Sequence, residues 1–197
     1  MVQRLSLYAD LNPQNYVKAV RSLEVFCGME AHKFNESRSI YVPISEGDLF
    51  RLFLVRSEGK TYLESSEAPE AGKAIKVISQ SYFRAEILDG NVDNFMTDLG
   101  YRFDSDFEVE GVEFVYNQLI TFKVFKILTE ASKDLASQYV VSMSVDVETV
   151  TDLKAVDLAT QQLLNAQQEL KSCISFRRPQ NRAFNTRTPR GPPAKVQ

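Results

Sequence analysis

The segment at residues 119–128, LITFKVFKIL, most constrains the fold of this chain, because it is apolar on both faces of a predicted strand. Successive side chains of a strand point to opposite sides. One side carries Ile120, Phe122 and Val124, and the other carries Leu119, Phe125 and Ile127. Such a strand needs a cover on each side. One cover is the protein's own interior, and the second is either a helix of the same chain or a partner protein.

Period-two alternation and turn-forming residues predict many strands in the rest of the chain. We expect strands at residues 4–9, 40–42, 49–55, 75–79, 82–88, 103–110, 112–118, 119–128 and 139–147. Capping residues and apolar spacing predict three helices, one from Asn12 to Gly28, one from Asn91 to Gly100, and one over residues 151–174. Hairpin-length links join most strands, which favours an α+β fold with helices packed on an antiparallel sheet or barrel.

Length and composition are those of one globular domain with a tail, since the chain has 197 residues, 44% hydrophobic and 25% charged. We assign residues 1–176 to the domain and residues 177–197 to a basic, proline-containing tail, disordered or extended. No apolar run approaches the roughly 20 residues of a membrane span. The N-terminus also lacks the apolar stretch of a signal peptide. We therefore expect an intracellular protein with no membrane role.

Charge is distributed unevenly along the chain. From Lys171 onward there are seven basic residues and no acidic residue, so the preceding body carries a net charge of about −10. An acidic body argues against a domain whose whole surface grips nucleic acid, and we expect no direct sequence-specific nucleic-acid binding. The basic tail, residues 177–197, could still contact phosphate or an acidic partner. Binding of nucleic acid through this tail is kept as an alternative.

Metal, cofactor and catalytic motifs are missing from the sequence. The two cysteines, Cys27 and Cys173, form no CxxC pair, and His32 is the single histidine, which is too few ligands for a zinc site. We expect both thiols to be reduced and buried within helices. The sequence has no P-loop, no GxGxxG and no GxSxG. We therefore predict a protein that is not an enzyme, with no cofactor and no metal.

Three glutamates around Gly111 provide the alternative to this conclusion. Glu108 and Glu110 share one face of an extended strand, and paired inward carboxylates can hold a divalent cation that binds phosphate. A metal-dependent, tunnel-type triphosphate hydrolase would use Glu108 and Glu110 with inward basic residues such as Arg51 and Lys123. The simpler interpretation is that the glutamates are solvated residues flanking a hairpin turn at Gly111.

The segment FMTDLGYRFDSDFEVEGVEFVYNQLITFKVFKIL, residues 95–128, resembles the signature region of the Mediator subunit 18 family. That family belongs to the head module of the Mediator coactivator of RNA polymerase II. The resemblance rests on Leu99-Gly100, Tyr101-Arg102, Asp106-Phe107, Gly111 and the strand at residues 124–128. The N-terminal strand and helix, and the strand at residues 139–145, also resemble the family. The likeness covers about residues 3–175 and does not extend to the tail.

The resemblance implies an antiparallel β-barrel with the architecture of tunnel triphosphatases but without their catalytic residues. It implies a heterodimer with Mediator subunit 20, capture of a C-terminal helix of Mediator subunit 8, and contacts with other head-module subunits and RNA polymerase II. It also implies a nuclear location. For residues near a partner interface we choose Tyr116, Leu119, Phe122 and Phe125, beside the alternative that they belong to the core.

Overall fold

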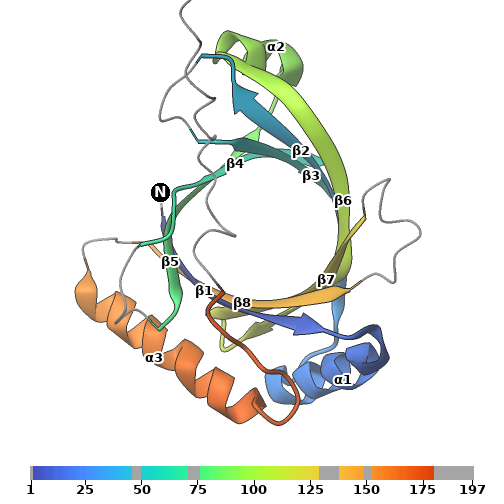
Figure 1. Ribbon diagram of the computed structural model, residues 1–197, viewed down its shortest axis with the longest axis vertical. Helices are drawn as coiled ribbons and strands as arrows, with labels where there is room; N and C mark the ends of the chain where they lie inside the picture. The colour runs from blue at the N-terminus through green and yellow to red at the C-terminus, as the bar shows by residue number, and fades with distance from the viewer. Residues whose placement is uncertain (1, 46–49, 71–75, 129–137, 149–151, 180–197) are drawn as a thin grey trace, which may run out of the picture.

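A computed structural model describes residues 2–45, 50–70, 76–128, 138–148 and 152–179 of the chain. Eight strands close into an antiparallel barrel in the order β1-β5-β4-β3-β2-β6-β7-β8, as Figure 1 shows. The strands are β1 (Val2–Leu11), β2 (His32–Pro43), β3 (Leu52–Ser57), β4 (Lys60–Ser66), β5 (Ile78–Ile87), β6 (Tyr101–Tyr116), β7 (Ile120–Leu128) and β8 (Tyr139–Val147). The described helices are η1 (Pro13–Asn15), α1 (Tyr16–Cys27), α2 (Val92–Asp98) and α3 (Leu153–Leu170). The predicted α+β fold, an antiparallel barrel with three packed α-helices, is confirmed.

The predicted helices form where their capping residues place them. Asn12 accepts the backbone N–H of Gln14 and starts the short η1 turn that leads into α1. Gly28 ends α1 with a φ of 66°, the left-handed conformation that glycine adopts without strain. Asn91 accepts the N–H of Asn94 at the start of α2. These caps satisfy backbone groups that a helix end leaves open, so they act locally and are visible in the sequence.

The long strand β6 corrects the predicted hairpin at Gly111. Residues 101–116 form one continuous strand, and the chain reverses only at Asn117 and Gln118, which have φ values of 51° and 56°. Gly111 lies in the middle of the strand because the neighbouring strand comes very close. A Cβ at this position would lie 2.2 Å from the carbonyl oxygen of Val124. The glycine therefore serves close strand packing and not a turn.

Other strand boundaries also differ from the prediction. The two strands expected at residues 75–79 and 82–88 are one strand, β5, in the described part. Strand β2 is far longer than the predicted residues 40–42, and β4 was not predicted at all. Both contain many polar residues, because the face that they turn inward is charged. Alternation of apolar and polar residues is therefore a weak signal for them.

Helices α1 and α3 pack on the outer face of the barrel over β1, β7 and β8 (Figure 1). Phe122, Val124 and Ile120 of β7 are buried in this core. The second cover that the apolar β7 requires is therefore formed by helices of the same chain. A smaller core lies under α2, where Met96 packs with Tyr41 and Leu54. None of the helices in the described part of the chain combines the length and apolar content needed to span a membrane.

The chain beyond α3 returns to the barrel. Ile174 and Phe176 are buried in the main core, and Arg177 forms an isolated antiparallel bridge with Tyr8 of β1 through backbone hydrogen bonds of 3.1 and 2.7 Å. The boundary predicted after residue 176 stays a prediction. Most of the predicted tail, residues 180–197, lies outside the described residues.

Candidate functional site

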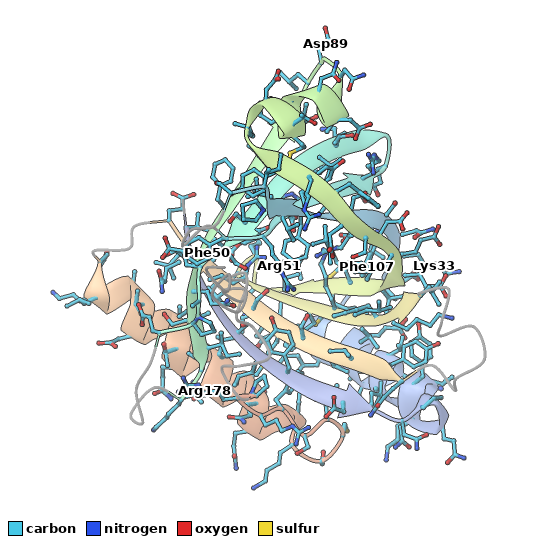
Figure 2. All side chains as sticks on the ribbon, turned by 45° about the horizontal axis from the view of Figure 1, so that its top comes forward. Lys33, Phe50, Arg51, Asp89, Phe107 and Arg178 are labelled. Carbon is cyan, nitrogen blue, oxygen red and sulfur yellow. The ribbon has the colours of Figure 1, made fainter. Side chains whose placement is uncertain are left out.

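The barrel interior is a cavity of about 710 Å³ with a polar, charged wall. Its lining includes Arg4, Arg38, Arg51, Arg84, Lys123, Glu64, Glu113 and Asp146. Figure 2 shows Arg51 among the side chains gathered in the middle of the molecule. Both basic residues that the sequence suggested for an inward position, Arg51 and Lys123, do line this cavity. The inward carboxylates, in contrast, differ from the predicted ones.

Ion pairs tie the inward charges of different strands together. The Lys123 Nζ on β7 lies 3.3 Å from Glu36 of β2 and 3.1 Å from Glu113 of β6. Glu36 also pairs with Arg38 at 2.5 Å. Opposite charges that face each other on neighbouring strands stabilise the strand pair. The network therefore joins β2, β6 and β7 from inside the barrel.

A second group of inward charges lies on β1, β4, β5 and β8. The Arg84 Nε lies 3.4 Å from Glu64. Arg4 donates two hydrogen bonds of 2.6 Å to the two oxygens of Asp146, directly across from it on β8. The Arg4 guanidinium also lies 3.5 Å from the ring centre of Tyr82. Such two-pronged guanidinium–carboxylate pairs are among the strongest polar contacts in proteins.

These surroundings change the pKa values of the inward groups. Burial works to raise the pKa of Glu36, but the charges of Arg38 and Lys123 outweigh it and hold the pKa below the ordinary value. Burial, helped by the charge of Glu64, raises the pKa of Tyr82 to about 12. Glu36 is therefore an ionised partner of two cations, and Tyr82 stays a neutral phenol near neutral pH.

The predicted metal-binding pair, Glu108 and Glu110, does not face the cavity. Glu113 lines the cavity, and alternation along β6 therefore turns Glu108 and Glu110 outward. Glu110 pairs there with Lys126 at 2.7 Å, and Glu108 is exposed. The hypothesis of a hydrolase that uses these two carboxylates is wrong in its residues. Among the described residues there is also no cluster of three or more His, Cys, Asp or Glu that could hold a metal ion.

The inward carboxylates that sequence reasoning missed are Glu36 and Glu64. Both side chains are almost completely buried, with 5% and 8% of their surface exposed. The signal for Glu36 was present, since Glu36 and Arg38 stand at alternate positions of HKFNESRSIYV and so share one strand face. The short predicted strand at residues 40–42 hid this pattern.

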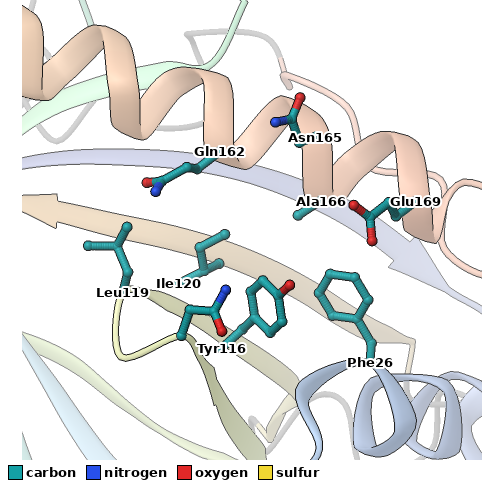
Figure 3. A pocket seen from close by; sticks show the side chains of 9 residues that line it. Phe26, Tyr116, Leu119, Ile120, Gln162, Asn165, Ala166 and Glu169 are labelled. Carbon is teal, nitrogen blue, oxygen red and sulfur yellow. The ribbon is translucent and has the colours of Figure 1, made fainter.

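A groove lies outside the barrel, between α3, the end of α1 and the β6–β7 turn (Figure 3). It has a volume of about 190 Å³, and the residues that define it here are Phe26, Tyr116, Leu119, Gln162, Asn165 and Glu169. The rings of Phe26 and Tyr116 stack at 4.5 Å. Leu119 is 40% exposed, whereas the Gln162 Oε1 is buried and accepts no hydrogen bond from the described residues. The groove thus offers an apolar floor beside the polar side chains of Asn165 and Glu169.

The four predicted interface residues separate into three places. Tyr116 and Leu119 line the groove, Leu119 also borders the barrel cavity, and Phe125 lines that cavity alone. Phe122 is fully buried and packs edge-on to Phe26 with ring centres 5.9 Å apart. Its ring is covered by the core of the same chain, which is the alternative that the sequence left open for this residue. On a strand with two apolar faces, the sequence does not show which face is covered.

The two cysteines also lie in different surroundings. Cys27 at the end of α1 is partly buried, and burial raises its pKa to about 11. Cys173 follows α3 and is exposed, which corrects the expectation of a buried thiol. Hydrogen bonds from Ser172 and Ser22 lower the pKa of Cys173. Both cysteines are free thiols.

The protein has a closed eight-stranded antiparallel barrel with a charged interior, and by this architecture it is a tunnel-like barrel. The structure is similar to a chain of the Schizosaccharomyces pombe Mediator head module, with a TM-score of 0.79, 15% identity, and coverage of 90% of this chain and 98% of that chain. It is also similar to a putative adenylyl cyclase from Hippeastrum, for which a dominant triphosphatase activity is described, with a TM-score of 0.56 and 11% identity over 94% of this chain and 97% of that chain. At such low identities the likeness shows a shared fold.

The sequence comparisons are more specific. A family model described as Med18 protein matches residues 48–187. Subunit 18 of the Mediator of RNA polymerase II transcription from Yarrowia lipolytica is 30% identical over 132 residues, which cover 64% of this chain and 57% of that protein. The chain belongs to the Med18 family, and the resemblance seen in the sequence is confirmed. The chain spans about half the length of the curated relatives that it matches.

Proposed function

We propose that this chain is a non-catalytic subunit of the Mediator head module and acts in the nucleus as a coactivator of RNA polymerase II transcription. Its action is binding, with Mediator subunit 20 as the partner barrel and a C-terminal helix of Mediator subunit 8 docked on its surface. Family membership and the names of the curated relatives support this proposal. The outward position of Glu108 and Glu110 argues against a hydrolase that uses these two carboxylates.

The groove is the observation that supports helix docking most directly. An amphipathic helix binds by placing a few apolar anchors into a groove, one turn apart. The volume of about 190 Å³ suits one or two such anchors against Phe26, Tyr116 and Leu119. The polar rim of Asn165 and Glu169 would face the polar side of the bound helix.

Binding of a labelled peptide with the C-terminal helix of subunit 8 tests this proposal. We expect Leu119→Asp to weaken binding by at least about tenfold, since the change removes apolar burial and places a charge on the groove floor. Leu158→Asp is the matched control, because Leu158 is 62% exposed on α3 and does not line the groove. Equal losses in the two variants, or a wild-type chain that does not bind, would contradict the docking site.

Recovery from nuclear extract tests the wider function. A tagged chain should co-purify with Mediator subunits, and subunits 8 and 20 should remain bound at the highest salt, as expected for largely apolar contacts. Leu119→Asp should lose subunit 8 selectively, and Leu158→Asp should keep it. Recovery of the chain alone would contradict membership in the complex.

A further inference from the structure

The charged cavity inside the barrel has no part in helix docking at the groove. Its wall carries five cationic side chains from β1, β2, β5, β7 and the segment before β3, namely Arg4, Arg38, Arg51, Arg84 and Lys123. Four carboxylates face them within the described residues, namely Glu36, Glu64, Glu113 and Asp146. The described part of the wall thus carries one positive charge more than is needed for balance. Charge gathered inside a low-dielectric wall acts strongly on an ion that enters it.

Among the described residues, Arg51 is the cavity cation that has no carboxylate partner within 4 Å. Each of the four carboxylates has a cationic partner within 4 Å: Arg4 for Asp146, Arg38 and Lys123 for Glu36, Arg84 for Glu64, and Lys123 for Glu113. The Arg51 Nε, in contrast, is buried and donates to no acceptor among the described residues. Buried donors without acceptors are rare in folded proteins, and each calls for an explanation. An anion bound against the part of the Arg51 guanidinium that lines the cavity would balance its charge.

We propose that the barrel interior binds a phosphate-type polyanion, with Arg51 as its principal ligand. The guanidinium group matches phosphate oxygens with two parallel donors. Cations from several strands surround one cavity, so an anion with several charged groups can contact more than one of them. Hydroxyl donors of Ser142, Ser144 and Thr121 lie in the same wall. The volume of about 710 Å³ is ample for a chain of two or three phosphates.

The function inferred here is binding without hydrolysis. Each inward carboxylate is held in an ion pair with arginine or lysine, so the wall presents cations to the anion. This site is separate from the groove, because the lining residues of the two overlap only at the rim, at Leu119. Failure of peptide docking at the groove would therefore leave anion binding untouched, and the reverse also holds.

Calorimetric titration of inorganic triphosphate into the full chain, at low salt and with a chelator present, tests the proposal. We expect one saturable site, and Arg51→Gln should weaken it by about tenfold through loss of a charge-assisted hydrogen bond. Arg51→Lys keeps the charge without the planar fork and should give an intermediate affinity. Arg102→Gln, on an exposed part of β6, is the control and should bind as the wild type does. Thermal unfolding by circular dichroism checks that each variant is folded.

Three results would overturn this inference. The wild-type chain could show no saturable binding of triphosphate. Arg51→Gln and Arg102→Gln could weaken binding equally, which would indicate general surface charge. Citrate could bind as tightly as triphosphate, which would exclude a preference for phosphate.

Discussion

The Lys123 ammonium on β7 lies 3.3 Å from the Glu36 carboxylate on β2, although β6 runs between these two strands. The contact is possible because both side chains point into the barrel, where the curved wall brings alternate strands close. Glu36 is 5% exposed and also pairs with Arg38. Its charge is thus compensated by two cations inside the protein. This arrangement makes Glu36 a test of what the inward charges contribute to stability.

The stability of the protein should depend on pH through Glu36. Its folded pKa lies below the ordinary value of 4.5, because Arg38 and Lys123 overcome the effect of burial. A carboxyl group with a lowered pKa stabilises the fold above its unfolded pKa, and this contribution is lost as pH falls through the folded pKa. Glu36→Gln should therefore lower the free energy of unfolding by about 1–3 kcal/mol at neutral pH.

Urea unfolding at neutral pH and at acidic pH measures this effect. The difference between wild type and Glu36→Gln should shrink as pH falls below about 4.5, because the wild-type carboxylate becomes protonated. A difference that stays constant over this range would show that the charge of Glu36 contributes nothing.

Gly111→Ala should destabilise the barrel. The new methyl group would lie 2.2 Å from the Val124 carbonyl oxygen and 2.8 Å from the Phe125 Cα, both backbone atoms that cannot move alone. We expect a loss of at least about 2 kcal/mol in the free energy of unfolding. Glu108→Ala, at an exposed position of the same strand, should change stability by less than about 0.5 kcal/mol. Equal stability of the two variants in thermal unfolding would contradict the close approach.

Phe122→Ala and Leu119→Ala should separate the core from the groove. Phe122 is fully buried, so its truncation should cost about 3–5 kcal/mol of stability. Leu119 is 40% exposed, and its truncation should cost less than about 1 kcal/mol while weakening capture of the subunit 8 helix. Chemical denaturation and peptide binding, measured on both variants, give the two quantities. A large stability loss in Leu119→Ala would place that residue in the core instead.

The two thiols should react at different rates with iodoacetamide. Burial raises the pKa of Cys27 to about 11, which leaves little thiolate at pH 8. Hydrogen bonds from Ser172 and Ser22 lower the pKa of Cys173, which is also exposed. Mass spectrometry should find Cys173 alkylated first in the folded protein. Both should react alike in denaturant, and faster reaction of Cys27 in the folded state would contradict the structure.

Local signals in the sequence determined the helices and the clearest strands. Gly28 and Asn91 mark helix ends because they satisfy backbone groups within a few residues of themselves. Strand β8 was predicted with its bounds at residues 139–147, since its outer face is apolar against α3 and its inner face is polar. Tyr116 and Leu119, two of the four chosen interface residues, lie together in the groove, and their place in a partner interface stays a prediction.

Closure of the barrel decided what the sequence by itself could not. Strands β2 and β4 were shortened or missed because their inward faces are charged, and a charged interior has no apolar period to detect. Gly111 suggests a turn in the sequence, but only the packing of β7 against β6 shows why glycine stands there. Glu36 and Lys123 are 87 positions apart. They meet because β6 pairs with both β2 and β7 and the wall curves inward. Pairing between strands far apart in the chain is not recorded in any local pattern.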